Sequence, residues 1–215
     1  ETEPKGFHIL GLEHNTVSCT FPSLPKGSYT AQVKFSFDFE TWAYVTYTFV
    51  DLELKRAMEM EGKNVNTELD IDPLPRSVYS SGPVMLGMGT LVDQPIGVDV
   101  KANSREPVLG VTFDNLWTEG VATGNSITIL VPQDFKLIKC DRGTPEVETG
   151  KEPGYDAYTF SKIDPRQTFT SVTCRLQIVD PAKLVSGAQK VERTFVSIAT
   201  YNYVLKKSVS FSVKE

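Results

Sequence analysis

The sequence has few of the residues on which metal and redox chemistry depends. It holds two histidines, His8 and His14, and three cysteines, none of which forms a Cys-x-x-Cys pair. A zinc or redox site would therefore lack its usual ligands. Glycine-rich phosphate loops are absent as well, because the glycines stand singly at expected turns. These absences predict a protein that is not an enzyme and has no catalytic residue, cofactor or metal site.

Oxygen ligands for calcium are present but poorly arranged. Asp70 with Asp72, and Asp114 with Asn115 and Glu119, are the two groups that could offer such oxygens. Neither group has the ordered spacing of a calcium loop, and Asp and Asn are ordinary turn residues. We therefore expect turns at both places.

Basic clusters and long apolar runs are also missing. The chain has 22 Lys and Arg against 27 Asp and Glu, a net charge of −5 that is spread thinly. Without a basic stripe to neutralise phosphates, nucleic acid is not an expected partner. No apolar run approaches the roughly 20 residues that span a bilayer, so no transmembrane segment is expected in this chain. The first residue is Glu1 rather than Met, which predicts trimming by signal-peptide removal, by proteolysis or in preparing the protein.

The cysteines predict one disulfide. A bond between Cys140 and Cys174 would stabilise the fold by roughly 3–4 kcal/mol on a chain-entropy estimate. Such a bond indicates an oxidising, extracellular compartment. The alternative is two buried thiols in a reducing cell. Cys19 is left without a partner.

Alternation of apolar and polar residues dominates what is present. From Tyr29 to Phe39 every second residue is apolar, which is the period of a half-buried strand. A second alternating run from Trp42 to Val50 predicts a hairpin with its turn at 39–42. Residues 51–61 contain strong helix formers and stop at Gly62, which predicts the one helix of the chain. The polar stretch 63–75 follows as a connector.

Short strand candidates recur after residue 76 at the spacing of an antiparallel sandwich. The predicted fold class is all-β, with tandem immunoglobulin-like antiparallel β-sandwiches of which the first is incomplete, joined by a short helical connector. The expected domains are 1–50, an incomplete lobe of closing strands; 51–76, a helix and polar connector; and 77–215, a complete sandwich. The predicted strands of the last domain are Val84–Leu91, Ile96–Lys101, Val108–Asp114, Ser126–Val131, Phe135–Cys140, Tyr155–Phe160, Phe169–Val179, Arg193–Tyr203 and Ser208–Val213.

An internal match suggests why the first lobe is incomplete. Thr16–Phe21 matches Ser171–Leu176 with its cysteine in register, and Val33–Phe39 resembles Ser197–Tyr203. The second copy closes a nine-strand domain, whereas almost nothing precedes the first copy. Residues 1–50 would then leave an exposed edge and an unshared apolar face. Three explanations stay open: a fragment of a longer protein, a strand supplied by a neighbouring subunit, or a self-contained lobe packed on the second domain.

Large aromatic residues are the candidates for contact with another chain. Phe35, Phe37 and Phe39 fit a sheet core better than a carbohydrate platform, although an unfinished lobe would leave them at an interface. Trp117 is expected in a loop, either as a core plug or as an exposed anchor, and a core position fits better. The predicted interface residues are Cys19, Phe35, Phe37, Phe39, Trp42 and Trp117.

Turn and strand patterns carry one family resemblance. Ser81-Gly-Pro-Val84, the strand Val108–Asn115, Gly120 and the strand Ile127–Pro132 resemble immunoglobulin-like modules of archaeal S-layer and other cell-surface proteins. The resemblance implies an extracellular structural or adhesive role. We therefore expect a non-enzymatic structural protein of a cell envelope, filament or surface lattice, with other protein chains as partners. The alternatives are an extracellular module that binds a protein or glycan, and an accessory β-domain of a secreted hydrolase.

Overall fold

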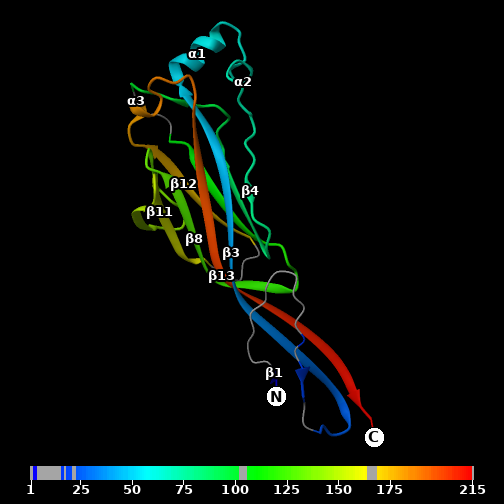
Figure 1. Cartoon of the computed structure of the whole chain (residues 1–215). Helices are drawn as coiled ribbons and strands as arrows, with labels where there is room; N and C mark the ends of the chain where they lie inside the picture. Colours follow the sequence, from blue (N-terminus) through cyan, green and yellow to red (C-terminus); the bar gives the residue numbers. More distant parts are fainter. Residues whose placement is uncertain are drawn as a thin grey trace. The chain divides into compact units, whose positions relative to one another are not determined.

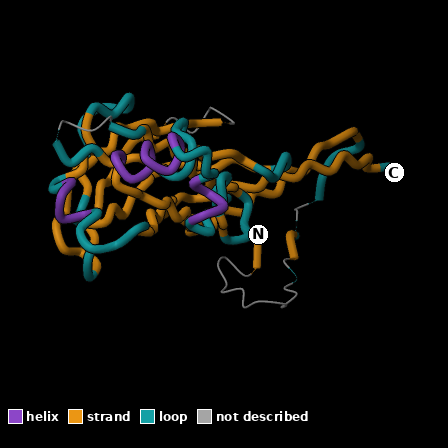
Figure 2. Tube along the Cα trace, turned by 90° about the horizontal axis from the view of Figure 1, so that it is seen from above, coloured by secondary structure: helices purple, strands orange, loops and turns teal. Residues whose placement is uncertain are grey.

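The computed structural model divides the chain into two compact units. The terminal unit comprises Glu1–Lys34 and Lys206–Glu215, and the sandwich unit comprises Phe35–Leu205. Strands account for most of the chain, and the helices are short (Figures 1 and 2). The structure describes residues 2–3, 16, 18–20, 23–101, 106–163 and 169–214.

The larger sheet has seven strands. Their order is β10–β11–β8–β13–β3–β4, and β6 pairs with β3 in parallel, while the other registered pairs are antiparallel. The strands β3 and β13 are neighbours in this sheet and can be followed side by side in Figure 1. The bounds are β3 (Gly27–Asp51), β4 (Val78–Tyr79), β6 (Ile96–Val98), β8 (Gly120–Pro132), β10 (Glu146–Glu152), β11 (Tyr155–Ile163) and β13 (Val191–Val213).

A four-stranded antiparallel sheet covers the inner face of the larger one. Its order is β5 (Val84–Thr90), β7 (Val108–Asn115), β12 (Phe169–Ile178) and β9 (Phe135–Ile138). One hydrophobic cluster takes inward side chains from both sheets. Aromatic rings meet across it, with Phe49 and Phe135 at 4.9 Å between centroids and Phe113 and Tyr201 at 5.6 Å. The all-β antiparallel prediction is confirmed, with two sheets packed as a sandwich.

Strand β3 is continuous, so the predicted turn at 39–42 is wrong. Odd-numbered residues face inward on both sides of this point: Phe39 packs against the core, while Thr41 and Ala43 are fully buried. Residues 39–42 contain no Gly, Pro, Asn or Asp, and an unbroken period of two needs no reversal. β13 is likewise one strand where two were expected.

The predicted helix is confirmed as α1 (Leu52–Met60). The Asp51 carboxylate caps its first turn by accepting from the backbone N–H of Glu53 and Leu54. At the other end Gly62 takes a φ of +72°, and Lys63 N–H donates to the Met58 carbonyl at 3.0 Å. This is a Schellman ending, for which glycine is favoured because it adopts positive φ without a steric cost.

Two further short helices were not predicted. They are α2 (Val65–Glu68) and α3 (Pro181–Leu184). α2 lies within the expected polar connector, where Val65, Leu69 and Ile71 are buried against Val50. The connector is therefore packed onto the sandwich unit. The sequence did not reveal this, because the buried residues are separated by polar ones without a clear period.

The two compact units meet between residues 34 and 35 and between residues 205 and 206, whereas the predicted domain boundaries were at residues 50 and 76. The part of β3 in the sandwich unit belongs to the same sheet as β13, and its residues are not set apart as a lobe. The matched segments 33–39 and 197–203 meet there, since Phe37 contacts Tyr203 and Phe39 contacts Tyr201. Alternation identifies a strand, but it does not identify the sheet that the strand joins.

The terminal unit contains short paired segments. β1 (Thr2–Glu3) pairs with β2 (Ser18–Cys19), with Thr2 opposite Cys19. The first residues of β3 and the last of β13 also belong to this unit, where Tyr29 stacks on Phe211 at 5.8 Å. Cys19 is exposed and free of a disulfide.

Candidate functional site

The outer face of the larger sheet carries an exposed aromatic patch. On β3 the odd residues Ala43 and Val45 are fully buried, so the even residues Trp42 and Tyr44 point away from the core. Their rings stack at 6.0 Å with an interplanar angle of 19°. Trp42 is 43% exposed and Tyr44 37%. We define the aromatic patch as Trp42, Tyr44 and Val78.

Strand β4 completes this patch at the edge of the sheet. Tyr44 lies opposite Val78, which is 45% exposed and shares its face, while Tyr79 lies opposite Ala43 on the other face of the sheet. The backbone is fixed by Ser80 N–H, which donates to the Trp42 carbonyl at 2.9 Å. The large rings are therefore held on a rigid sheet, a position typical of contact residues.

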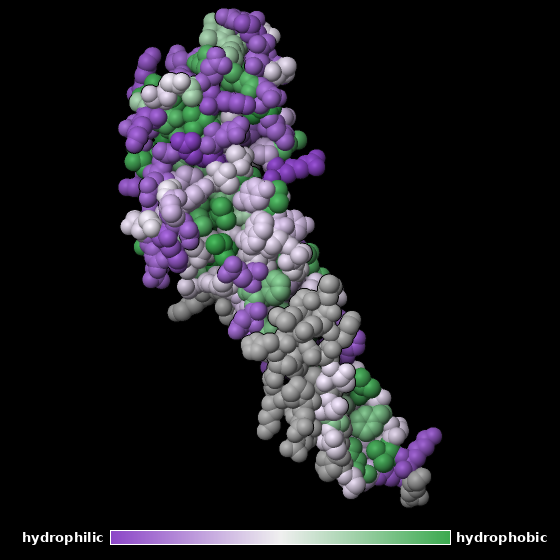
Figure 3. All heavy atoms as spheres, viewed as in Figure 1, coloured by the Kyte–Doolittle hydropathy of each residue, from purple (hydrophilic) through white to green (hydrophobic). Residues whose placement is uncertain are grey.

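Apolar side chains of β13 extend the patch across the sheet. The contact of the Thr46 and Thr194 hydroxyls, at 2.8 Å, sets the register of the two strands. In antiparallel order Val196 and Ile198 then lie beside the aromatic patch, and both are half-buried. Figure 3 shows apolar side chains exposed among hydrophilic ones over part of one face of the molecule. An uncharged apolar surface of this kind can bind another surface.

The predicted aromatic ladder divides between two environments. Phe37 and Phe39 are partly buried and pack against the core, with ring distances of 5.7 Å to Tyr203 and 6.0 Å to Tyr201. Phe35 is 38% exposed. Of these phenylalanines, only Phe35 presents much surface to a partner.

Trp117 lies in the loop between β7 and β8, half in contact with the core. Its ring meets Tyr203 edge to face at 5.6 Å and 88°, while 43% of the residue stays exposed. The Tyr203 hydroxyl lies 2.9 Å from both the Asn115 amide oxygen and the Trp117 carbonyl. The Asn115 amide donates to the Gly120 carbonyl at 2.8 Å. The loop is thus bonded to the core, and burial raises the pKa of Tyr203 above its ordinary value.

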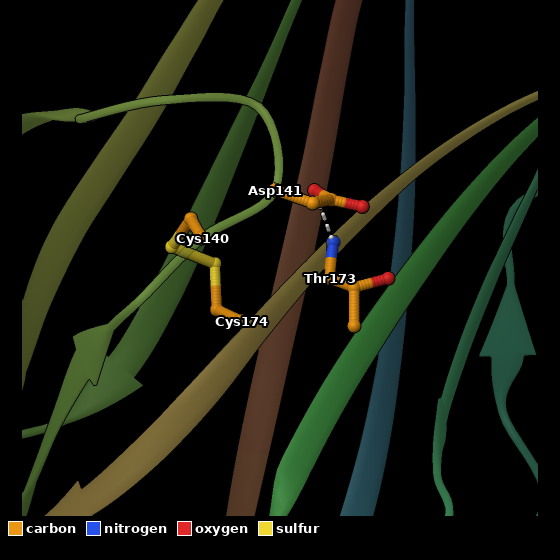
Figure 4. The surroundings of a disulfide bond; sticks show 4 residues. All are labelled: Cys140, Asp141, Thr173 and Cys174. Carbon is orange, nitrogen blue, oxygen red and sulfur yellow. Dashed lines mark hydrogen bonds between the residues drawn. A yellow bond between two sulfur atoms is a disulfide. The ribbon is translucent and has the colours of Figure 1, made fainter.

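The predicted disulfide between Cys140 and Cys174 forms (Figure 4). Cys174 lies on β12, and Cys140 lies two residues beyond β9. The bond therefore links β12 to the segment that follows its neighbouring strand in the smaller sheet. Asp141 flanks the bond: its N–H donates to the Thr173 carbonyl at 3.0 Å, and its carboxylate accepts from Thr173 N–H at 2.9 Å. The disulfide therefore fastens one edge of the smaller sheet and does not join the two sheets.

Lys139 explains how Cys140 reaches its partner. Arg175 is paired with Ile138, so a regular ladder would place Lys139 opposite Cys174. Lys139 instead takes a φ of +50°, and Asp141 bonds to Thr173 one position later than a regular ladder requires. The extra residue acts as a bulge that brings Cys140 opposite Cys174.

Of the oxygen-bearing groups, Asp72 and Glu119 lie in turns, whereas Asp114 and Asn115 end strand β7, where a turn was expected. The Asp72 carboxylate accepts from Leu74 N–H at 2.9 Å, and Asn115 is engaged within its own loop. Among the described residues, no three His, Cys, Asp or Glu side chains gather closely enough to hold a metal ion. His8 and His14 lie outside the described residues.

Sequence reasoning missed Tyr44 and Val78. The signal for Tyr44 was present, because the run Trp42-Ala-Tyr-Val45 is apolar at both odd and even positions. Such a strand is apolar on both faces of its sheet, and only one face can be the core. Val78 follows a proline-rich stretch, in which no alternation marks a strand.

Comparison with known proteins gives no relative on which to rest a function. No family model matches the chain, and no curated protein shows significant sequence similarity to it. Within the described residues, none of the helices has both the length and the apolar character to cross a membrane.

Proposed function

We propose that this protein is a non-enzymatic, extracellular structural component of a cell envelope, filament or surface lattice, and that it assembles with further copies of itself through the aromatic patch. The observation that carries this proposal is the stacked pair Trp42–Tyr44, which is exposed on the outer face of a rigid sheet. Aromatic side chains held in this way supply most of the binding energy in many protein interfaces.

The patch can receive a second copy without bringing like charges together. The chain carries a net charge of −5, so two copies repel each other at long range. The aromatic patch and its neighbours Val196 and Ile198 bear no formal charge, so two such surfaces can meet without pairing like charges. A patch that contacts its own copy also generates a symmetric dimer, the commonest closed assembly.

The edge of the sheet adds a second route to assembly. β4 covers β3 over two residues, Ala43 and Tyr44, and β6 pairs with its last three. Short edge strands limit uncontrolled pairing, and they also leave room for a strand of a neighbouring chain. A lattice built through strand and sandwich contacts is therefore compatible with the topology.

The disulfide supports the proposed location. Disulfides persist in oxidising compartments and are rare in the cytosol. The bond between Cys140 and Cys174 is consistent with an extracellular protein. The two-sheet antiparallel architecture is also compatible with the immunoglobulin-like modules of cell-surface proteins, which the turn and strand patterns resemble.

A binding or adhesion role is the second candidate. Exposed, nearly parallel rings such as those of Trp42 and Tyr44 offer apolar surface on which a sugar ring or a partner side chain can pack. In that case the patch would bind a glycan or a different protein, and the chain would stay monomeric.

Sedimentation velocity over a wide concentration range tests the assembly proposal. We expect a monomer–dimer or higher equilibrium that persists at high salt, because apolar contacts are little screened. Replacing Trp42 and Tyr44 together with serine should weaken association by about tenfold or more. Trp117→Ser is the matched control, equally exposed but outside the patch, and it should associate as the native chain does. A native protein that stays monomeric at every concentration overturns the proposal, and binding of the native chain on a glycan array would then favour the second candidate.

A further inference from the structure

We propose that a ribbon in the terminal unit of one copy binds the edge strand β10 of a second copy, with lysines of the ribbon against glutamates of β10. We define the terminal ribbon as residues 26–34 and 206–214, which include the first part of β3 and the last part of β13. This inference rests on the proposed assembly of the chain with its own copies. It adds a contact that differs from the aromatic patch in chemistry and in symmetry.

Positive charge is concentrated in the terminal ribbon. The ribbon contains five lysines and no Asp or Glu. The terminal unit as a whole has six lysines and four glutamates, a formal charge of +2, and the whole chain carries −5, so the sandwich unit carries −7. The ribbon of one copy is therefore attracted to the sandwich unit of another, although two whole copies repel each other at long range.

Two lysines of the ribbon lie directly opposite each other. The Thr30 and Ser210 hydroxyls lie 3.2 Å apart, which sets the register of the two strands. In antiparallel pairing this register places Lys34 opposite Lys206, and both residues are exposed. Like charges directly opposite are unfavourable, and neither lysine has an ion-pair partner among the described residues. An anionic partner would relieve this repulsion.

Negative charge lies on the edge strand β10. The strand ends the larger sheet, pairs only with β11 in the described part of the chain, and has every residue exposed. It carries Glu146, Glu148 and Glu152 against a single Lys151, which pairs with Glu148 at 2.8 Å. Within the described residues, Glu146 and Glu152 have no ion-pair partner. The strand therefore offers carboxylates beside an unpaired row of backbone N–H and C=O groups.

The two sets of charges match in spacing. Glu146 and Glu148 lie two positions apart on one strand, so they share a face and their backbones are about 7 Å apart. Directly opposite residues of an antiparallel ribbon, such as Lys34 and Lys206, are about 5 Å apart, and long lysine side chains span the difference. A carboxylate accepts several hydrogen bonds, so Glu148 can hold Lys151 and a ribbon lysine together.

The same charges disfavour the other pairings of these surfaces. Two ribbons would bring lysines together, and two β10 edges would bring glutamates together, whereas a ribbon against β10 pairs opposite charges. The contact is therefore heterologous, because each copy contributes a different surface. A heterologous contact that does not close generates an open filament, while a patch that contacts its own copy stops at a dimer. A lattice requires both kinds of contact.

Sedimentation velocity on the full-length Trp42→Ser, Tyr44→Ser variant tests this contact apart from the aromatic patch. We expect species larger than a dimer at about 0.02 M salt and monomers at about 0.5 M salt, because salt screens exposed charges. The patch contact is measured separately, as association of the native chain that persists at high salt. A native chain that associates at high salt, with a patch variant that stays monomeric at low salt, overturns only the ribbon contact. The reverse result overturns only the patch contact.

Charge reversal in the same patch variant identifies the two surfaces. Lys34→Glu with Lys206→Glu, and separately Glu146→Lys with Glu148→Lys, should each weaken low-salt association by about tenfold or more. An equimolar mixture of the two proteins should associate again, which would also show that both are folded. The two Glu→Lys changes bring the net charge from −5 to −1, so a loss of association in that protein cannot come from greater overall repulsion.

Lys101→Glu with Lys183→Glu is the matched control. It changes the net charge as much as the ribbon variant does, at two exposed lysines of the sandwich unit, and it should associate as its parent does. A mixture of the charge-reversed proteins that stays monomeric overturns the inference, as does a control that loses association as fully as the ribbon variant. A chain that is monomeric at low salt but binds dextran sulfate through Lys34 and Lys206 also overturns it, and would assign the ribbon to an anionic glycan.

Discussion

The two ends of β3 share one alternation but differ in burial. In the sandwich unit Val45, Tyr47 and Phe49 are at most 1% exposed. In the terminal unit no residue of 27–34 is buried, although Tyr29, Ala31 and Val33 follow the same period of two. Alternation therefore records the pleat of a strand, while the depth of burial depends on what packs against it.

This difference predicts where the stability of the protein lies. A two-stranded ribbon is at best marginally stable by itself, whereas a sandwich shares one core between two sheets. The sandwich unit should therefore dominate the free energy of unfolding. Three predictions test this comparison.

The largest expected effect is from Phe49→Ala. Phe49 is fully buried and its ring lies 4.9 Å from that of Phe135, so the truncation should cost about 3–5 kcal/mol of the free energy of unfolding. Tyr29→Ala in the terminal unit removes the stack on Phe211 and should cost about 1 kcal/mol or less. Urea denaturation followed by tryptophan fluorescence measures both. Equal losses would show that the terminal unit contributes as much as the sandwich unit.

The next effect concerns the cysteines. Replacing Cys140 and Cys174 together with serine should lower the free energy of unfolding by about 2–4 kcal/mol, because the unfolded chain loses a cross-link. Cys19→Ser in the terminal unit should change it by at most about 0.5 kcal/mol, since Cys19 is exposed and free. Differential scanning calorimetry, with and without reductant, distinguishes the two. A reductant that leaves the melting temperature of the native chain unchanged would contradict the structural role of the bond.

The smallest effect is expected from removing the Tyr47 hydroxyl. Tyr47 is buried, and its hydroxyl has no partner among the described residues, so Tyr47→Phe should be neutral or stabilising by about 1 kcal/mol at pH 7. Tyr29→Phe, whose hydroxyl donates to the Pro25 carbonyl at an exposed site, should lose about 0.5 kcal/mol or less. A gain in the free energy of unfolding for Tyr47→Phe and a loss for Tyr29→Phe would sharpen the contrast between the two units. A large loss for Tyr47→Phe would contradict the prediction that its hydroxyl is unfavourably buried.

The pH dependence of the same variant gives an independent check. Burial raises the pKa of Tyr47 above that of the unfolded chain. A group with a raised folded-state pKa contributes stability below its unfolded value, near 10, and loses it as the pH rises further. The native protein should therefore lose stability above about pH 10, and Tyr47→Phe should lose less. Parallel alkaline unfolding curves for the two proteins would assign the loss to other groups.

Local residue chemistry was enough to predict several features. α1 followed from helix formers that end at Gly62, and the disulfide from a cysteine pair at suitable separation. β10 was not predicted, because its sequence Glu-Val-Glu-Thr-Gly-Lys-Glu has no apolar period and every residue is exposed. It is a strand because its backbone pairs with β11, and this pairing requires no particular pattern of side chains in the sequence.

The candidate sites could likewise be predicted only in part from the sequence. Trp42 and Trp117 could be named from their residue type, but their exposure, 43% for each, could not. Lys34 and Lys206 gave no signal at all, because two lysines far apart in the sequence become neighbours only when β3 and β13 pair in their register.

The order of the amino acids alone determined the β class, the helix that follows Asp51 and the cysteine pair, since these depend on period, capping and composition within short stretches. Tertiary structure alone decided that residues 35–51 share a sheet with 191–205, which aromatic rings face solvent and which lysines lie opposite each other. These outcomes depend on contacts between segments far apart in the chain, and they cannot be predicted from the pattern within a single segment.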